Sequence, residues 1–187
     1  MEMTMKKILS LIFGLLMTYQ VQAQQVEFKT SLGDFVVELQ ASKAPKTVEN
    51  FLQYVESGFY QGTIFHRVID GFMVQGGGFN EKMEQKLTRA PIPIESNNGL
   101  KNQIYTIAMA RTANPNSATA QFFINVVDNP NLDYPRPDGH GYTVFGKVIK
   151  GTATIDKIKS VGTGRFGPHS DVPLRPILIQ QVKVIGR

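Results

Sequence analysis

The sequence predicts a single, mainly-β domain, an antiparallel barrel or sandwich that also carries two helices. Segments near the start of the domain alternate apolar and polar residues, and further strand candidates follow through to its end, so strands outnumber helices. Strands do not alternate regularly with helices, which disfavours a parallel sheet. The length of 187 residues fits one domain, and no internal repeat divides it.

The first 23 residues are predicted to be a secretory signal peptide that is cleaved from the mature protein. Two lysines precede the apolar run ILSLIFGLLM at 8–17, and Val21-Gln22-Ala23 fits a cleavage site. The apolar run is far shorter than the roughly 20 residues that span a bilayer, so a membrane anchor is disfavoured. We therefore expect an exported domain at 24–187, in the periplasm or outside the cell, without stable membrane insertion.

Composition excludes several classes of function. The chain has no Cys, so it has no disulfide, cysteine nucleophile or cysteine-bearing zinc site. The formal net charge is +5, but the basic residues are scattered, so we expect a solvated surface and no nucleic-acid site. His66, His140 and His169 are not in metal-binding spacing, so neither a metal nor a cofactor is expected. His66 is interpreted as a buried, hydrogen-bonded residue.

The first elements of the domain are predicted to be a hairpin and a helix. Residues 26–30 and 35–39 alternate in polarity on either side of a polar turn at 31–34. Pro45 suits the first turn of a helix that Gly58 ends. Apolar residues at i, i+3, i+4 and i+7 give this helix one core-facing stripe, Val48, Phe51, Leu52 and Val55.

The remaining elements are mostly strands. They are predicted at 63–69, 72–75, 104–110, 121–126, 142–149 and 177–185, with a short helix at 152–159. Two long connections, 79–103 and 127–141, separate them, and long ordered loops in a compact domain are often functional.

Two motifs are rejected. GTGRFG at 162–167 matches GxGxxG, but it follows a helix and runs into Pro168, so a flexible loop is predicted there instead of a dinucleotide site. Ser117, His140 and Asp133 could be drawn as a hydrolase triad, but the sequence has no G-x-S-x-G elbow.

The segment FHRVIDGFMVQGGG at 65–78 combines strand-like residues with a cation and an amide. In an extended strand, Phe65, Arg67 and Ile69 would share one face. A bend at Gly71 could then gather four side chains on one patch. These side chains are Arg67, Phe72, Met73 and Gln75. The segment alone leaves open the alternative that Arg67 extends to solvent from a core strand.

A second segment has similar chemistry. MARTANPNSATAQFFIN at 109–125 places a loop of small and polar residues before a strand that carries Gln121, Phe122 and Phe123. Together the two segments supply apolar side chains, two amides and one guanidinium, which favours a shared surface site.

These segments resemble the cyclophilins, a family of peptidyl-prolyl cis-trans isomerases. The resemblance rests on FHRVIDGFMVQGGGF, IYTIAMAR, SATAQFFINV and YTVFGKVIKG, with PKTVENF in the first helix. It spans 26–185 and is strongest to the bacterial, exported branch. It implies a closed eight-stranded antiparallel β-barrel capped by two helices. The packed interior of such a barrel would leave the active site on the outer surface.

The resemblance also implies roles for individual residues. Arg67 matches the catalytic arginine of the family. The walls of the proline pocket match Phe72, Met73, Phe123 and Leu132. The groups that hold the substrate backbone match Gln75, Gln121 and the backbone of Ala110 and Arg111. This chain departs from the family at three positions, with Arg111 for an asparagine, Tyr142 for a pocket histidine and Asn131 for a rim tryptophan.

These residues suit a reaction that breaks no covalent bond. Rotation about an X–Pro amide meets a barrier of about 18–20 kcal/mol, and the enzyme must favour the twisted amide. A guanidinium stays protonated and presents a planar fork of donors, so Arg67 can stabilise that amide. The expected partners are proline-containing segments of folding or unfolded exported proteins, bound by a monomer. The alternative is a proline-binding module or holdase with little turnover.

Overall fold

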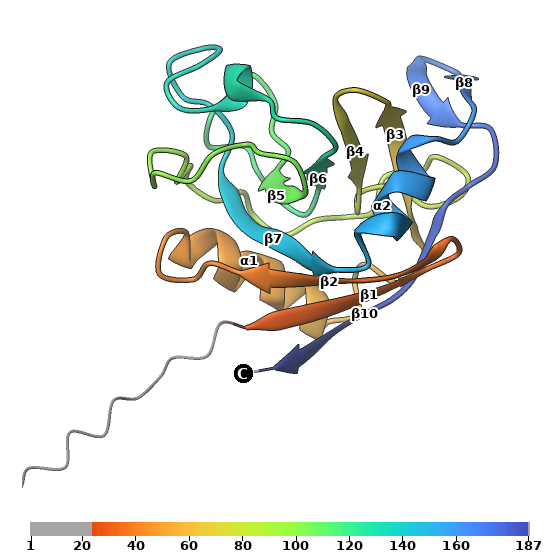
Figure 1. The fold of residues 1–187 in the computed structure, drawn as a ribbon, viewed down its shortest axis with the longest axis horizontal. Helices are drawn as coiled ribbons and strands as arrows, with labels where there is room; N and C mark the ends of the chain where they lie inside the picture. Colours follow the sequence, from red (N-terminus) through yellow and green to blue (C-terminus); the bar gives the residue numbers. More distant parts are fainter. Residues whose placement is uncertain (1–23, 187) are drawn as a thin grey trace, which may run out of the picture.

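The structure, a computed structural model, describes residues 24–186. The predicted signal peptide lies outside the described residues. The described part of the chain contains ten strands, two α-helices and one 3-10 helix (Figure 1). In chain order these are β1 Gln25–Thr30, β2 Gly33–Leu39, α1 Pro45–Glu56, β3 Thr63–Ile69, β4 Met73–Gly76, β5 Thr106–Met109, β6 Phe122–Asn125, η1 Pro130–Leu132, β7 Val144–Lys150, α2 Thr152–Lys159, β8 Thr163–Phe166, β9 His169–Pro173 and β10 Leu178–Gly186.

Eight of the strands close into an antiparallel barrel. Their order is β1-β10-β3-β4-β6-β5-β7-β2, so the first and last strands of the domain are neighbours. Helix α1 contacts β10, and helix α2 contacts β2, β3 and β4. This confirms the predicted closed barrel with two helices, and the strands lie within two residues of their predicted bounds.

Aromatic side chains fill the barrel interior. Phe28 stacks on Phe35 with ring centroids 4.6 Å apart, and Phe122 meets Phe28 edge to face at 5.5 Å. Phe51 of α1 reaches Phe145 at 5.1 Å, so the helix closes the same core. Large aromatic rings each bury much apolar area and pack favourably at such distances. A filled barrel has no lumen, so a binding site must lie on its outside.

The long 79–103 connection helps to hold helix α1. Ala44 at the N-cap has no capping side chain, and the carboxylate of Glu95 replaces it. This carboxylate accepts hydrogen bonds from the backbone N–H groups of Lys46 and Thr47, at 3.1 and 2.8 Å, and from the Thr47 hydroxyl. A negative charge at a helix N-terminus satisfies free donors and opposes the helix dipole. The predicted functional loop therefore has a structural role here.

Strand β3 departs from the predicted alternation. Phe65 pairs with Gly76 and Arg67 with Gln75, so His66 is an extra residue in a β-bulge. The bulge separates Phe65, which is fully buried in the core, from Arg67, which faces outward. The prediction that these two residues share a face was wrong. Gly71, with φ of +74°, lies in the turn between β3 and β4 rather than in a bulge of one continuous strand.

The GTGRFG segment is also different from its prediction. It lies in β8, which pairs with β9 in a two-stranded sheet outside the barrel. Phe166 pairs with His169, so Gly167 and Pro168 form a two-residue turn. Glycine and proline are suited to such a turn. The segment that was expected to be a flexible loop is therefore a β-hairpin, with an irregularity between Gly164 and Phe166.

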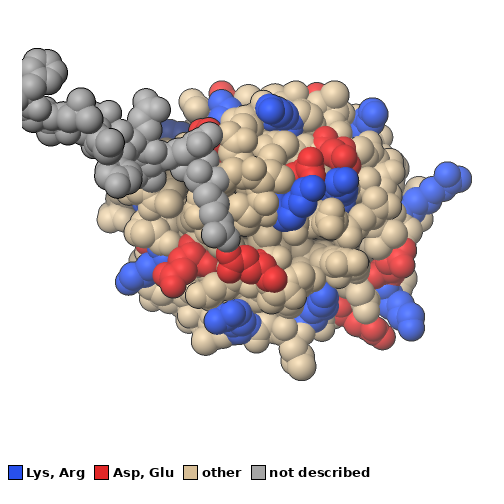
Figure 2. Space-filling view, turned by 90° about the horizontal axis from the view of Figure 1, so that it is seen from below, with Lys and Arg blue, Asp and Glu red and all other residues tan. Residues whose placement is uncertain are grey.

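Charges of both signs are mixed on the face seen in Figure 2, where blue and red side chains alternate over a largely uncharged surface. This face therefore offers no single-sign surface to a polyanion. Between residues 24 and 186, no helix has the length and apolar character that crossing a membrane requires.

Candidate active site

A hollow on the outside of the barrel brings together most of the predicted site residues. Its volume is about 120 Å³. It lies where β3, β4 and β6 are neighbours in the barrel, with the loops after β5 and around η1 at its sides. The lining residues are Arg67, Phe72, Met73, Gln75, Ala110, Arg111, Phe123, Leu132 and Tyr142. All nine were predicted from the sequence.

Arg67 supplies the exposed permanent charge of the hollow, whereas the guanidinium of Arg111 is buried and paired with Asp138. The side chain of Arg67 is 41% exposed, and its Nε lies 3.9 Å from Oδ2 of Asp171 on β9. The β-bulge at His66 turns Arg67 outward, so this irregularity of β3 places the guanidinium in the hollow. A half-exposed guanidinium can still donate several hydrogen bonds to a bound molecule.

Two amides lie beside the guanidinium. The amide nitrogen of Gln75 donates to the side-chain oxygen of Gln121 at 3.0 Å, across the β4–β6 pair. Gly78 makes room for this arrangement, because a Cβ there would lie 2.4 Å from Cγ of Gln121. Gln121 does not itself line the hollow, so its predicted contact with substrate would require its amide to turn from Gln75.

The apolar wall of the hollow belongs to a small cluster separate from the main core. Met73 and Phe123 are nearly fully buried and pack with Ala108 and Val144. Half-buried apolar side chains complete the cluster on the solvent side, and they include Phe72, Leu132 and Tyr142. A partly open apolar surface of this kind suits a small ring such as that of proline.

The backbone at Ala110 is partly occupied. Its N–H donates to the carbonyl oxygen of Gln121 at 3.0 Å. A substrate that binds the Ala110 backbone must therefore donate a hydrogen bond to the carbonyl oxygen of Ala110.

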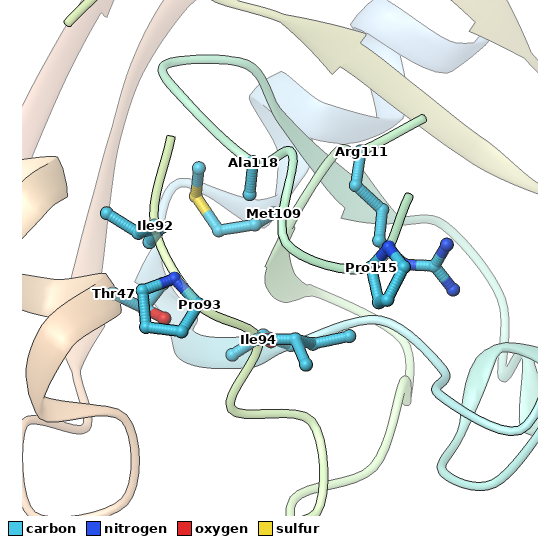
Figure 3. Close-up of a pocket in the computed structure, with 9 residues that line it drawn as sticks. Thr47, Ile92, Pro93, Ile94, Met109, Arg111, Pro115 and Ala118 are labelled. Carbon is cyan, nitrogen blue, oxygen red and sulfur yellow. The ribbon is translucent and has the colours of Figure 1, made fainter. Parts of the chain in front are cut away.

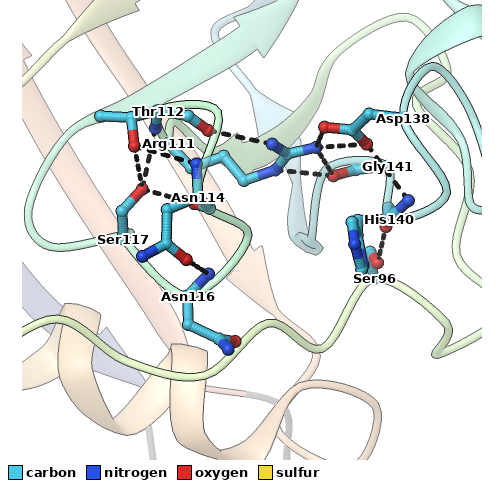
Figure 4. Close-up of polar contacts among 9 residues, drawn as sticks. All are labelled: Ser96, Arg111, Thr112, Asn114, Asn116, Ser117, Asp138, His140 and Gly141. Carbon is cyan, nitrogen blue, oxygen red and sulfur yellow. Dashed lines mark hydrogen bonds and ion pairs between the residues drawn. The ribbon is translucent and has the colours of Figure 1, made fainter.

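The side chain of Arg111 acts inside the protein. It is only 3% exposed and donates to the carbonyl oxygens of Gly141 and Thr112 and to the carboxylate of Asp138, all at 2.8–3.0 Å (Figure 4). These hydrogen bonds hold the pKa of Asp138 below its usual range. The guanidinium also lies 4.4 Å from the centre of the Tyr142 ring. Tyr142 in turn packs edge to face on Phe123 at 5.7 Å. Arg111 therefore supports one wall of the hollow from behind.

A chain of polar side chains that sequence reasoning missed supports the opposite wall. Asn129 donates to the carbonyl oxygen of Phe72 at 2.8 Å and to Oδ1 of the buried Asn125 at 2.7 Å. Asn125 donates to Asn102, and Asn102 donates to the carboxylate of Asp133. Buried amides need such partners, so the chain links Phe72 to the 79–103 and 127–141 connections. The three asparagines in loops and strand ends carried no periodic signal in the sequence.

His66 is buried, as predicted. Its Nδ1 has no partner among the described residues. The ring packs against Phe79 at 4.6 Å, and Phe79 meets His169 of β9 at 5.4 Å. Burial, with the nearby His169 and Arg67, lowers the pKa of His66 to about 4. The imidazole is therefore neutral at pH 7.

The rejected hydrolase triad is not assembled. The hydroxyl of Ser117 bonds to Thr112 and to the Asn114 carbonyl (Figure 4). Asp133 instead accepts hydrogen bonds from Asn102. Within residues 24–186, no three His, Asp or Glu side chains lie close enough together to hold a metal ion.

A second hollow lies behind the 110–118 loop, between it, α1 and residues 92–94 (Figure 3). Its volume is about 10 Å³, which is about the space of one water molecule. We interpret it as a packing gap and place no ligand there.

A filled eight-stranded barrel whose external hollow combines the exposed guanidinium of Arg67, the amide of Gln75 and an apolar wall defines a barrel protein with its candidate site on the outer surface. Comparison with known proteins identifies the family. The profile described as "Cyclophilin type peptidyl-prolyl cis-trans isomerase/CLD" matches residues 25–184. The chain therefore belongs to the cyclophilin-type peptidyl-prolyl cis-trans isomerases, as the sequence motifs predicted.

Named relatives agree with this assignment. The peptidyl-prolyl cis-trans isomerase cyp18 of Streptomyces antibioticus is 57% identical over 163 residues, which cover 86% of this chain and 98% of that protein. Peptidyl-prolyl cis-trans isomerase B of Escherichia coli is 56% identical over 161 residues, or 85% of this chain and 98% of that protein. A crystal structure of a Cryptosporidium parvum cyclophilin-type isomerase superimposes with a TM-score of 0.73 at 30% identity, covering 88% of this chain and 99% of that one.

Proposed function

We propose that this chain accelerates rotation about X–Pro bonds in proteins that are folding or unfolded after export, and that Arg67 and the hollow beside it carry the reaction. The observation that carries this proposal is the juxtaposition of an outward guanidinium with an apolar wall in one hollow of about 120 Å³. Family membership supplies the class of reaction. The assignment to individual residues rests on the geometry and on the matching motifs.

The proposed mechanism divides the work between the wall and the cation. Phe72, Phe123 and Leu132 hold the proline ring, while the chain on one side of the bond turns. Arg67 donates to the amide as it twists and loses conjugation. One charge-assisted hydrogen bond supplies roughly 1.5–3 kcal/mol, whereas a millionfold acceleration needs about 8 kcal/mol. Orientation in the hollow must therefore contribute most of the acceleration.

The amides and the backbone have a supporting role in this mechanism. Gln75 and the Ala110 carbonyl oxygen offer one donor and one acceptor without adding charge, so they can align the substrate backbone on either side of the proline. Tyr142 closes the hollow where it packs on Phe123. No step requires a group that titrates near neutral pH.

The place of action is also a proposal. The basic, apolar and small-residue pattern of residues 1–23 supports cleavage after Ala23 and export of the domain at 24–187. Secretion of a full-length chain, followed by N-terminal sequencing of the product, tests this. A mature N-terminus at Gln24 supports it, and retention of Met1 contradicts it.

The test of the site is a proline-isomerisation assay on the chain that starts at Gln24. Arg67→Ala is expected to remove nearly all of the acceleration and to leave the circular dichroism spectrum unchanged. Arg165→Ala is the matched control, because it removes an exposed arginine on β8 that does not line the hollow. Full turnover by Arg67→Ala would refute the role of Arg67.

The same peptide distinguishes the alternative function, a binding module with little turnover. The departures at Arg111, Tyr142 and Asn131 motivate that alternative. Binding and exchange are measured together: tight binding without acceleration by the wild-type chain would favour the module.

A further inference from the structure

We propose that Asp171, on the β8–β9 hairpin outside the barrel, is a positioning residue that orients the guanidinium of Arg67. This inference rests on the proposed role of Arg67. Asp171 does not line the hollow, and neither the periodicity nor the motifs of the sequence single it out.

The ion pair is made to one edge of the guanidinium. Oδ2 of Asp171 lies 3.9 Å from Nε of Arg67, and the two side chains are 39% and 41% exposed. A carboxylate 3.9 Å from Nε attracts the guanidinium from that edge and leaves the two terminal nitrogens, the outer part of the donor fork, for a substrate. Within residues 24–186, Asp171 is the one carboxylate that forms an ion pair with Arg67.

The carboxylate is itself held in place. The hydroxyl of Ser170 donates to Oδ2 of Asp171 at 3.2 Å, the same oxygen that faces Arg67. The backbone of Asp171 has φ of +58°, in the left-handed region. Asp is one of the few residues that tolerate this conformation, and a non-glycine residue in this region often marks a functional site.

The hairpin is fastened to β3 next to Arg67. His66, the residue before Arg67, packs on Phe79, and Phe79 packs on His169, two residues before Asp171. Strands β3 and β9 are in contact along this region. The stack of His66, Phe79 and His169 therefore fixes the distance between the strand that carries Arg67 and the strand that carries Asp171.

An exposed ion pair contributes little to stability, so a purely structural explanation is weak here. Its effect on a reaction can be larger, because a catalytic group must be held close to its productive orientation. The hairpin thus acts as an external arm that limits the rotamers of Arg67.

The experiment is a double-mutant cycle with Asp171→Asn and Arg67→Lys in the proline-isomerisation assay. Asp171→Asn keeps the size of the side chain and the tolerance for positive φ. It is expected to lower kcat about threefold to tenfold with a smaller change in KM. In the Arg67→Lys background the same substitution should have no further effect, because the fork that it orients is gone. Asp34→Asn, which removes an exposed carboxylate from the β1–β2 hairpin, is the control for net charge.

A second readout does not depend on activity. The Nε–Hε resonance of Arg67, assigned by its disappearance in Arg67→Lys, is expected to shift in Asp171→Asn and to stay in place in Asp34→Asn. Thermal unfolding of each variant checks that the fold is retained.

The outcomes separate the two proposals. If Arg67→Lys and Arg67→Ala keep full turnover, the role of Arg67 itself fails. If Arg67→Ala is inactive while Asp171→Asn matches the wild type in kcat and in the Arg67 resonance, only the positioning role fails. An equal loss from Asp171→Asn in both backgrounds also overturns it, because Asp171 would then act independently of Arg67.

Discussion

His66 gives a quantitative prediction for stability in acid. His66 is 5% exposed, its Nδ1 has no partner among the described residues, and burial lowers its pKa from 6.5 to about 4. The unfolded chain therefore binds a proton near pH 6.5, whereas the folded chain resists protonation until about pH 4. Stability linked to His66 is fully present above pH 6.5 and is lost as the pH falls toward 4.

The magnitude follows from the two pKa values. A difference of one pKa unit corresponds to about 1.4 kcal/mol, so the full loss below pH 4 is about 3 kcal/mol. At pH 5 the loss relative to pH 7.5 is about 2 kcal/mol. A domain of this kind has a total stability of roughly 5–15 kcal/mol, so this loss is large enough to measure.

Urea unfolding at pH 7.5 and pH 5 measures it, in the wild type and in His66→Phe. Phenylalanine keeps an aromatic ring against Phe79 and cannot be protonated, so the variant should lose about 2 kcal/mol less than the wild type between the two pH values. His140→Gln, which removes an exposed histidine, is the control and should behave as the wild type. Equal losses in the wild type and in His66→Phe would refute the reasoning, because the acid sensitivity would then come from other groups.

Two further predictions concern the supports of the fold and of the site. Glu95→Ala should lower the free energy of unfolding by about 1–2 kcal/mol in urea titrations, because helix α1 loses its capping carboxylate. The control Glu81→Ala, at an exposed position, should have almost no effect on the free energy of unfolding. An equal loss in both variants would contradict the capping role of Glu95. Gly78→Ala should lower kcat/KM about tenfold in the isomerisation assay, because the new Cβ displaces Gln121 and breaks its hydrogen bond to Gln75. In Gly186→Ala the new Cβ has only ordinary contacts, so it should retain wild-type activity; unchanged activity in Gly78→Ala would show that the Gln75–Gln121 bond is dispensable.

Local patterns sufficed for most of the fold. Alternation predicted the β1–β2 hairpin, and the Val48-Phe51-Leu52-Val55 stripe with Pro45 predicted helix α1, because both signals depend on near neighbours along the chain. The prediction that eight strands close into a barrel came from the family resemblance, because the strand pattern alone also allowed a sandwich. The β8–β9 hairpin was missed because glycine and proline are equally suited to a tight turn and to a loop.

The nine residues that line the hollow were predicted, but their supports were not. A long-range contact leaves no periodic signal, so neither Glu95 capping a helix 48 residues away nor Asn129 holding Phe72 could be recognised. The position of the β-bulge could not be predicted from the sequence either. Alternation assigns Phe65 and Arg67 to one face, and only the pairing of β3 with β4 shows the extra residue at His66. Arg111 was assigned through its backbone, whereas the structure adds a buried side chain that holds Tyr142 and Asp138.

The solid interior of the barrel has a consequence for the length of molecule that the protein can handle. A hollow on a convex outer wall has no tunnel or mouth through which a chain must pass, so a bound segment can continue into solvent in both directions. Under the proposed function, an internal proline in a long client is then as accessible as one in a short peptide, provided that the segment around it is extended. The selectivity of the protein would be set by the local exposure of the proline and would be independent of the distance to either end of the client.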